Sequence, residues 1–115
     1  LKIYTNLLRL VERTPQIGRC QEDEIKYFDF YNTCTNCTIL ITATTFSVDW
    51  DVDLFVNFGS SKGFPTKESA DFWSESWISE TLEIKMTDDY FKNGNIKSVK
   101  GLFLIGVYSE RGATF

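Results

Sequence analysis

Three aspartates at alternate positions, Asp49, Asp51 and Asp53, form the pattern in this sequence that comes closest to a metal site. Side chains at alternate positions of a strand share one face and lie about 6.6–7 Å apart. A loop carboxylate such as Asp71 could therefore join two of them around Ca²⁺. There is no Asp-x-Asp-x-Asp-Gly loop, however, and strand carboxylates often only accept hydrogen bonds from neighbouring loop amides. Calcium binding is one expectation for these residues, and structural hydrogen bonding is the favoured one.

Tryptophans offer a second kind of site. Trp73 and Trp77, close to Phe72, could form a flat apolar platform for sugar rings, because aromatic faces bury apolar area while nearby polar groups orient the ligand. Trp50 alternates with apolar residues and is expected to face the core. The competing expectation for the other tryptophans is that they cap the core. Trp73 and Trp77 are the pair expected to contact a glycan.

Cysteine usage indicates where the protein works. Cys20, Cys34 and Cys37 permit one disulfide and leave one thiol, and the sequence does not decide among the three pairings. Asn36 begins an Asn-Cys-Thr sequon, which is an acceptor for N-glycosylation. Together these features favour an extracellular or cell-surface location. The alternative is a cytosolic domain with three unpaired thiols.

The composition excludes several function classes. The chain has 115 residues, the size of one domain, and it has no histidine, so neither a Ser-His-Asp triad nor a His-ligated zinc site can form. Sixteen Asp and Glu against twelve Lys and Arg give a net charge of −4, without the basic face that nucleic-acid binding requires. No apolar stretch approaches the roughly 20 residues of a membrane span. We therefore expect no enzyme, no nucleic-acid partner and no membrane insertion.

Alternation of apolar and polar residues predicts an all-β protein. Five segments rich in β-branched and aromatic residues are expected as strands: residues 25–31, 38–46, 50–58, 80–86 and 102–108. The last of these is apolar on both faces, as in a central strand. Residues 6–13 could form one or two helical turns, residues 65–79 are expected as a loop, and residues 88–100 as a polar segment with a turn. Short strands separated by turns indicate an all-β sandwich.

A series of motifs runs through the sequence from residue 51 onward. It comprises Asp-Val-Asp-Leu-Phe-Val (51–56), Phe-Gly (58–59), Pro-Thr (65–66), Asp-Phe-Trp (71–73), residues 80–84, Gly-Leu-Phe-Leu-Ile-Gly-Val-Tyr (101–108) and Gly-Ala-Thr-Phe (112–115). In order and spacing these motifs resemble the bacterial-type pre-peptidase C-terminal (PPC) domain family, and residues 26–30 are similar to its first strand. The resemblance implies a jelly-roll-like antiparallel β-sandwich appended to secreted proteins. Such domains have no catalysis of their own and act in adhesion, in substrate or carbohydrate contact, or as spacers.

The resemblance also implies one strand more than this sequence provides. In the family a further strand follows the Gly-Ala-Thr-Phe segment, and here residues 1–5 have the pattern of such a strand. The open slot could be filled by the chain's own N-terminus, by the neighbouring unit of a tandem array, or by a separate subunit through β-strand addition. We therefore interpret residues 1–19 as an N-terminal strand (1–5) plus a connector, and residues 20–115 as a PPC-like β-sandwich.

The leading hypothesis is a non-enzymatic, glycosylated, extracellular structural or adhesion module. Copies would assemble head to tail into a fibril or array, with Leu1, Ile3 and Tyr4 in the strand shared between units, because a head-to-tail contact need not close. The alternative is a carbohydrate- or protein-binding accessory module of a secreted hydrolase, acting through Trp73 and Trp77. No cofactor is expected apart from the calcium considered above.

Overall fold

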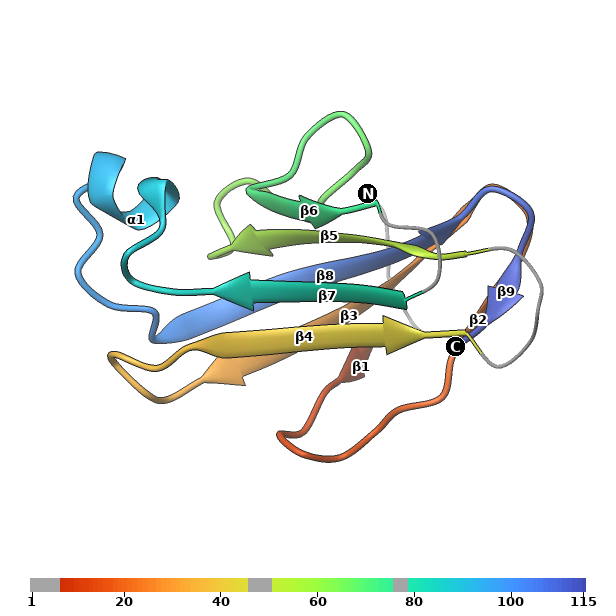
Figure 1. The fold of residues 1–115 in the computed structure, drawn as a ribbon, viewed down its shortest axis with the longest axis horizontal. Coiled ribbons are helices and arrows are strands. Elements are labelled where there is room, and N and C mark those ends of the chain that lie inside the picture. Colours follow the sequence, from red (N-terminus) through yellow and green to blue (C-terminus); the bar gives the residue numbers. More distant parts are fainter. Residues whose placement is uncertain (1–6, 46–50, 76–78) are drawn as a thin grey trace.

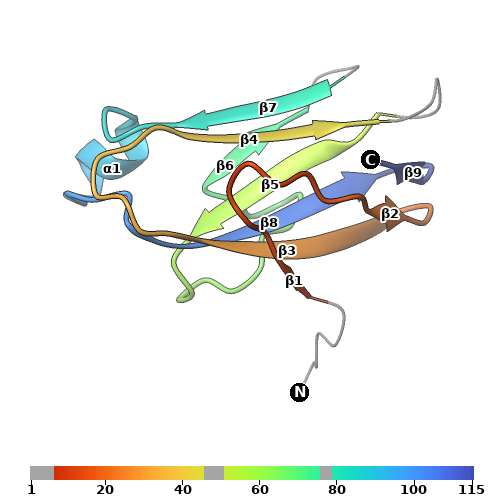
Figure 2. The same cartoon turned by 90° about the horizontal axis from the view of Figure 1, so that it is seen from below.

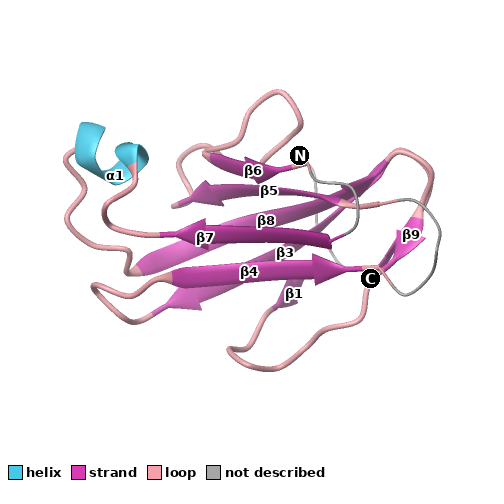
Figure 3. Cartoon of the chain, in the orientation of Figure 1, coloured by secondary structure: helices cyan, strands magenta, loops and turns pink. Residues whose placement is uncertain are grey.

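The computed structural model describes residues 7–45, 51–75 and 79–115, and within these ranges the protein is all-β with one short helix. The strands are β1 (Leu8–Arg9), β2 (Arg19–Cys20), β3 (Glu24–Asn32), β4 (Ile39–Thr44), β5 (Asp53–Phe58), β6 (Phe72–Ser74), β7 (Ser79–Ile84), β8 (Gly101–Ser109) and β9 (Ala113–Thr114). The helix α1 spans Asp89–Asn93, between β7 and β8 (Figure 3). The predicted all-β sandwich class is confirmed.

The larger layer is a five-stranded sheet with the order β1-β3-β8-β5-β6 (Figure 1). Its central strand, β8, pairs antiparallel with β3 along its whole length and with β5 from Phe103 to Tyr108. Residues 103–108 are all buried. This confirms the expectation that residues 102–108 form a central strand, since such a strand is covered on both faces.

A second, two-stranded layer of β4 and β7 lies in front of this sheet (Figures 1 and 2). The antiparallel register of β4 and β7 runs from Ile39–Ile84 to Thr44–Ser79. Alternate residues of the strands form the hydrophobic core between the layers, among them Ile39, Ala43, Leu54, Val56, Ile84, Phe103, Ile105 and Val107. The described chain is therefore a sandwich with unequal layers.

The loop between β5 and β6 covers part of the outer face of the five-stranded sheet. The Tyr27 hydroxyl donates to the carbonyl oxygen of Pro65 at 3.1 Å, and the Tyr27 ring lies 4.7 Å from that of Phe64. Gly106 lies opposite Tyr27 in the β3–β8 ladder, and a Cβ there would come within 3.3 Å of the Tyr27 ring. The side chains of Ile25 and Tyr27 thus fill the space that a side chain at position 106 would need. The covering loop explains why Phe55, on this outer face, is buried.

Three elements differ from the sequence expectation. β1 is a short strand parallel to β3, where one or two helical turns are expected, and Arg9 fixes it there through two hydrogen bonds of 2.9 Å to the carboxylate of Asp29. β6 lies inside the expected loop. α1 lies in the expected polar segment, anchored by Phe91, which is buried with its ring centroid 5.4 Å from that of Phe58.

Residues 10–18 connect β1 to β2 and pass across the side of the sandwich at which β4 ends the second layer (Figure 2). At the end of this connector, Gly18 and Phe115 exchange two backbone hydrogen bonds of 2.9 Å, which continue the antiparallel pairing of β2 with β9. The predicted shared strand, residues 1–5, lies outside the described residues.

Candidate functional site

β4 is an edge strand of the smaller layer. It pairs with β7 on one side, and no second strand among the described residues pairs with it. In an antiparallel ladder every second residue directs its N–H and C=O away from the partner strand. Within the described ranges no further backbone hydrogen bond reaches residues 39–44. Such a row of backbone groups is a template for another strand.

Several apolar side chains of β4, β1 and the connector are exposed. Leu40 on β4 is 63% exposed, Val11 and Ile17 on the connector are 63% and 66% exposed, and Leu8 on β1 is 45% exposed. β4, β1 and the connector lie together on the side that faces the viewer in Figure 2. Unpaired backbone beside apolar surface is what a sheet edge offers to an added strand.

A second site is the acidic cluster, in which Asp51, Asp53 and Glu80 each place a carboxylate oxygen within 4.8 Å of the others. Asp53 begins β5 and Asp51 precedes it, whereas Glu80 comes from β7 in the other layer and is buried. The hydroxyl of Ser74 donates a hydrogen bond to Oε2 of Glu80. Glu80 is not among the residues that the sequence predicts for a metal site; its only sequence signal is its position two residues before Leu82, on the inward face of the strand. Three carboxylates this close can hold a divalent cation or share a proton.

The surroundings of Asp53 favour its protonated form. Burial, and then the carboxylates of Asp51, Glu75 and Glu80, raise the pKa of Asp53 to about 6, against the opposing charge of Lys67. Burial and like charges both make the ionised form less favourable. Asp53 therefore titrates at a pH at which most exposed carboxylates are already ionised.

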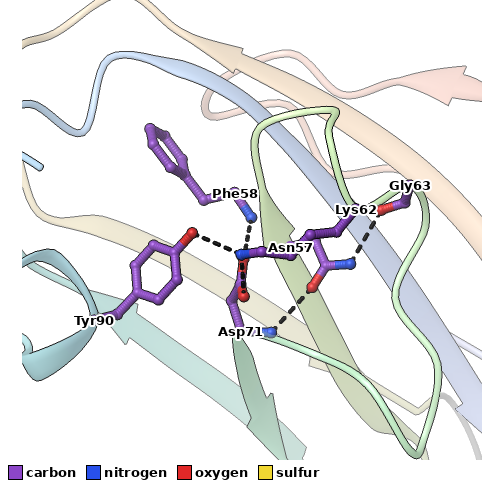
Figure 4. A network of polar contacts seen from close by, with 6 residues as sticks. All are labelled: Asn57, Phe58, Lys62, Gly63, Asp71 and Tyr90. Atoms are coloured by element: carbon purple, nitrogen blue, oxygen red, sulfur yellow. Dashed lines mark hydrogen bonds and ion pairs between the residues drawn. The ribbon is translucent and has the colours of Figure 1, made fainter. Parts of the chain in front are cut away.

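The structure places Asp71 away from the acidic cluster. Its Oδ2 accepts a hydrogen bond of 2.9 Å from the backbone N–H of Phe58, which ends β5 about 16 Å along the strand from Asp53. Its Oδ1 accepts from the ammonium of Lys62, which also donates to the Tyr90 hydroxyl (Figure 4). Asp71 cannot share a cation with Asp53 over that distance, which corrects the expected ligand set. Asp49, the remaining member of that set, lies outside the described residues.

Asn57 completes the polar network around Asp71 (Figure 4). Its buried side chain donates to the carbonyl oxygen of Gly63 and accepts from the backbone N–H of Asp71, both at 3.0 Å. These two bonds tie the loop of residues 59–71 to β5. The network is therefore structural, because it holds the loop that covers part of the outer face of the sheet.

Trp73 stands beside a shallow hollow. It lies on β6 opposite Phe55 of β5, and 60% of its surface is exposed. The hollow has a volume of about 190 Å³ and is lined by Phe55, Lys67, Glu68, Ala70, Trp73 and Glu75. Trp77, the other half of the expected sugar platform, and Trp50 lie outside the described residues.

The turn between β3 and β4 carries the disulfide. Cys34 and Cys37 are bonded, with Cα atoms 5.8 Å apart, and Cys20 is a buried free thiol. The pairing that the sequence left open is thus the local one. Asn36, in the same turn, is exposed, so its amide is accessible to modification.

No known protein family, curated protein or solved structure matches this chain. The resemblance to the PPC family therefore rests on the sequence motifs alone. Within the part of the chain that the structure describes, no helix has the length and apolar character needed to cross a membrane.

Proposed function

We propose that this domain is a non-enzymatic extracellular structural or adhesion module that assembles head to tail by strand addition at β4. The observation that carries the proposal is the outer edge of β4, which pairs with no further strand of the described chain. A strand added there would receive backbone hydrogen bonds along its length and extend the smaller layer over the core.

The donor that suits this edge is the segment of residues 1–5 from another copy. When extended, it directs Leu1 and Ile3 to one face and Lys2 and Tyr4 to the other. Each fully buried Leu or Ile contributes about 1.5–3 kcal/mol, and each backbone hydrogen bond adds about 0.5–1.5 kcal/mol. Because donor and acceptor are different surfaces, the contact repeats from copy to copy and builds a filament or array.

The turn between β3 and β4 supports the extracellular part of the proposal. A Cys34–Cys37 disulfide is typical of an oxidising compartment, and Asn36 is exposed within its sequon. Mass spectrometry of protein secreted from eukaryotic cells, before and after removal of N-glycans, tests the modification. An unmodified Asn36 in a secreted, disulfide-bonded chain would exclude glycosylation from the proposal.

Ile3→Asp tests the assembly. The substitution puts a charge on the apolar face of the donor strand, and burying it without a partner costs several kcal/mol. We expect the unmodified chain to sediment as oligomers and form filaments in electron micrographs, and Ile3→Asp to sediment as a monomer with an unchanged unfolding midpoint. Lys2→Asp is the matched control, because it introduces the same group on the opposite face. Ile3→Asp filaments as abundant as those of the parent would contradict the proposal.

Cysteine pairs distinguish exchange between copies from fold-back within one chain. We expect a chain with Lys2→Cys and a second chain with Leu40→Cys to form a disulfide-linked heterodimer when mixed and mildly oxidised, since both positions lie on the outward face of the extended layer. A single chain that carries both Lys2→Cys and Leu40→Cys tests fold-back, because it can form the disulfide within one molecule. Disulfide closure only within single chains would show that the N-terminus fills its own edge, and head-to-tail assembly would be excluded.

A further inference from the structure

The hollow beside Trp73 has the dimensions of a site for one side chain. Its volume of about 190 Å³ is smaller than the roughly 300–1,000 Å³ of pockets that hold drug-sized ligands. Phe55 and Ala70 contribute apolar lining, and Trp73, 60% exposed, offers an aromatic surface to the solvent. A long side chain with a flat or apolar portion fits this description.

Acidic groups dominate around the hollow. Glu68 and Glu75 line it against one base, Lys67. The ammonium of Lys67 is already engaged, because it lies 4.5 Å from the centre of the Tyr108 ring. Glu75 also acts on Asp53, so the charge of the acidic cluster adds to that of the hollow. The local field is therefore negative, and it attracts cations and repels anions.

We propose that this hollow binds the guanidinium group of an arginine from a basic segment of a partner protein. A guanidinium stacks on an aromatic face and donates hydrogen bonds to carboxylates with the same planar group. Trp73 supplies the face, and Glu68 and Glu75 supply the carboxylates. A neutral sugar would stack on Trp73 without gaining from the charge, and an acidic segment would be repelled. The hollow lies at β5 and β6, at the other end of the sheet from β1, so this inference is independent of strand addition at β4.

The test uses the complete chain and a labelled Gly-Arg-Gly-Arg-Gly peptide, followed by fluorescence polarisation at low salt. The matched ligand replaces each arginine with citrulline, which keeps the shape and removes the charge. We expect the arginine peptide to bind more tightly, and Trp73→Ala to weaken its binding about three- to thirtyfold. Trp73→Phe should restore part of the loss, and Glu75→Gln should weaken binding and reduce its salt dependence. Tyr31→Ala, which removes an exposed aromatic ring from β3, should change nothing.

Trp73→Ala leaves the net charge of −4 unchanged. Arginine-peptide binding that persists at full strength in this variant would overturn the proposal, because the attraction would then come from overall charge alone. Equal affinity for the arginine and citrulline peptides would overturn it as well. Saturable binding of cellohexaose or chitohexaose that is lost in Trp73→Ala, without arginine-peptide binding, would replace the proposal with a sugar platform.

Discussion

Asp53 is the residue at which electrostatics and stability are most directly linked. Burial and the carboxylates of Asp51, Glu75 and Glu80 raise its pKa to about 6 in the folded protein, whereas in the unfolded chain an aspartate titrates near 3.9. Between these two values the folded state binds more protons than the unfolded state. The free energy of unfolding therefore falls as pH rises from about 4 through about 6, and the stability that the protonated Asp53 contributes is lost above that range.

We predict that Asp53→Asn removes this pH dependence and is more stable than the parent at about pH 7, with little change at about pH 4. Urea unfolding followed by tryptophan fluorescence across this range measures the effect. Glu12→Gln is the control, because it removes one negative charge at an exposed connector position. A parent chain whose stability rises toward neutral pH would contradict the prediction. Recovery of the lost stability on adding Ca²⁺ would identify a cation as the countercharge of the acidic cluster.

Part of the acidic cluster is predictable from the sequence. Alternation alone brings Asp51 and Asp53 together, because both belong to one extended segment. Glu80 joins them from the other layer, and the packing of one layer on another is not encoded in local periodicity. That Asp71 lies at the opposite end of β5 from Asp53 cannot be predicted from the sequence, because the length of a loop does not say where its last residue returns to the strand. Here Asp71, the last residue of the loop, accepts a hydrogen bond from the backbone N–H of Phe58 at the end of β5.

At the scale of elements, α1 depends on tertiary packing for its existence. A helix of five residues is unstable in isolation, because nucleation costs more than so few hydrogen bonds return. Phe91 is fully buried, and its ring lies 5.4 Å from that of Phe58 and 5.9 Å from that of Phe72. The helix thus closes one end of the core, with Phe91 fully buried and the Tyr90 ring packed beside it, 5.2 Å from that of Phe72.

We predict that Phe91→Ala lowers the free energy of unfolding by about 3–5 kcal/mol, because it removes a buried ring and leaves a cavity. Lys92→Ala is the control on the same helix; its side chain is exposed, and we expect a change within about 0.5 kcal/mol. Urea denaturation of both variants gives the comparison. If Phe91→Ala lowered the free energy of unfolding as little as Lys92→Ala does, α1 would contribute little to the stability of the core.

The elements that the sequence predicts are those with a periodic signal of their own. β3, β4, β5, β7 and β8 are found within a few residues of their bounds, because each has an alternating or continuous apolar run. β1 and β6 have only two and three residues, too few for a period to be recognised. Their positions are set by neighbours, as the Arg9–Asp29 pair shows for β1.

At the scale of the whole molecule, the two layers differ in how much of their surface and backbone is covered or hydrogen-bonded by the rest of the chain. The five-stranded sheet is covered on its inner face by the core and on part of its outer face by the loop of residues 59–71, which Asn57 holds in place. The outer edge of β4 has neither a paired strand nor a hydrogen-bonded loop among the described residues. The connector passes on that side without a backbone hydrogen bond to β4. The strand addition that we propose at this edge would supply the backbone partners that β4 lacks there.

Moving residues 1–5 to the C-terminus tests whether the outer edge of β4 is the acceptor for the donor strand. The C-terminus lies beside the end of β4 (Figures 1 and 2), so a strand attached after Phe115 could turn back and run antiparallel along the outer edge. We predict that transferring residues 1–5 to this position through a short glycine linker gives a monomer. Relative to a chain that lacks residues 1–5, its unfolding free energy should rise by about 1–3 kcal/mol, because apolar burial and hydrogen bonds exceed the ordering entropy.

Light scattering after size-exclusion chromatography gives the mass of the transferred variant, and urea unfolding gives its stability. The same transfer with Ile3→Asp is the control, because it keeps the length and the linker and removes the apolar contact. We expect this control to gain no stability, since the charged side chain cannot enter the core. If the transferred variant assembled like the parent, or if the control were equally stabilised, then β4 would not be the acceptor. The filament would have to be built through another surface.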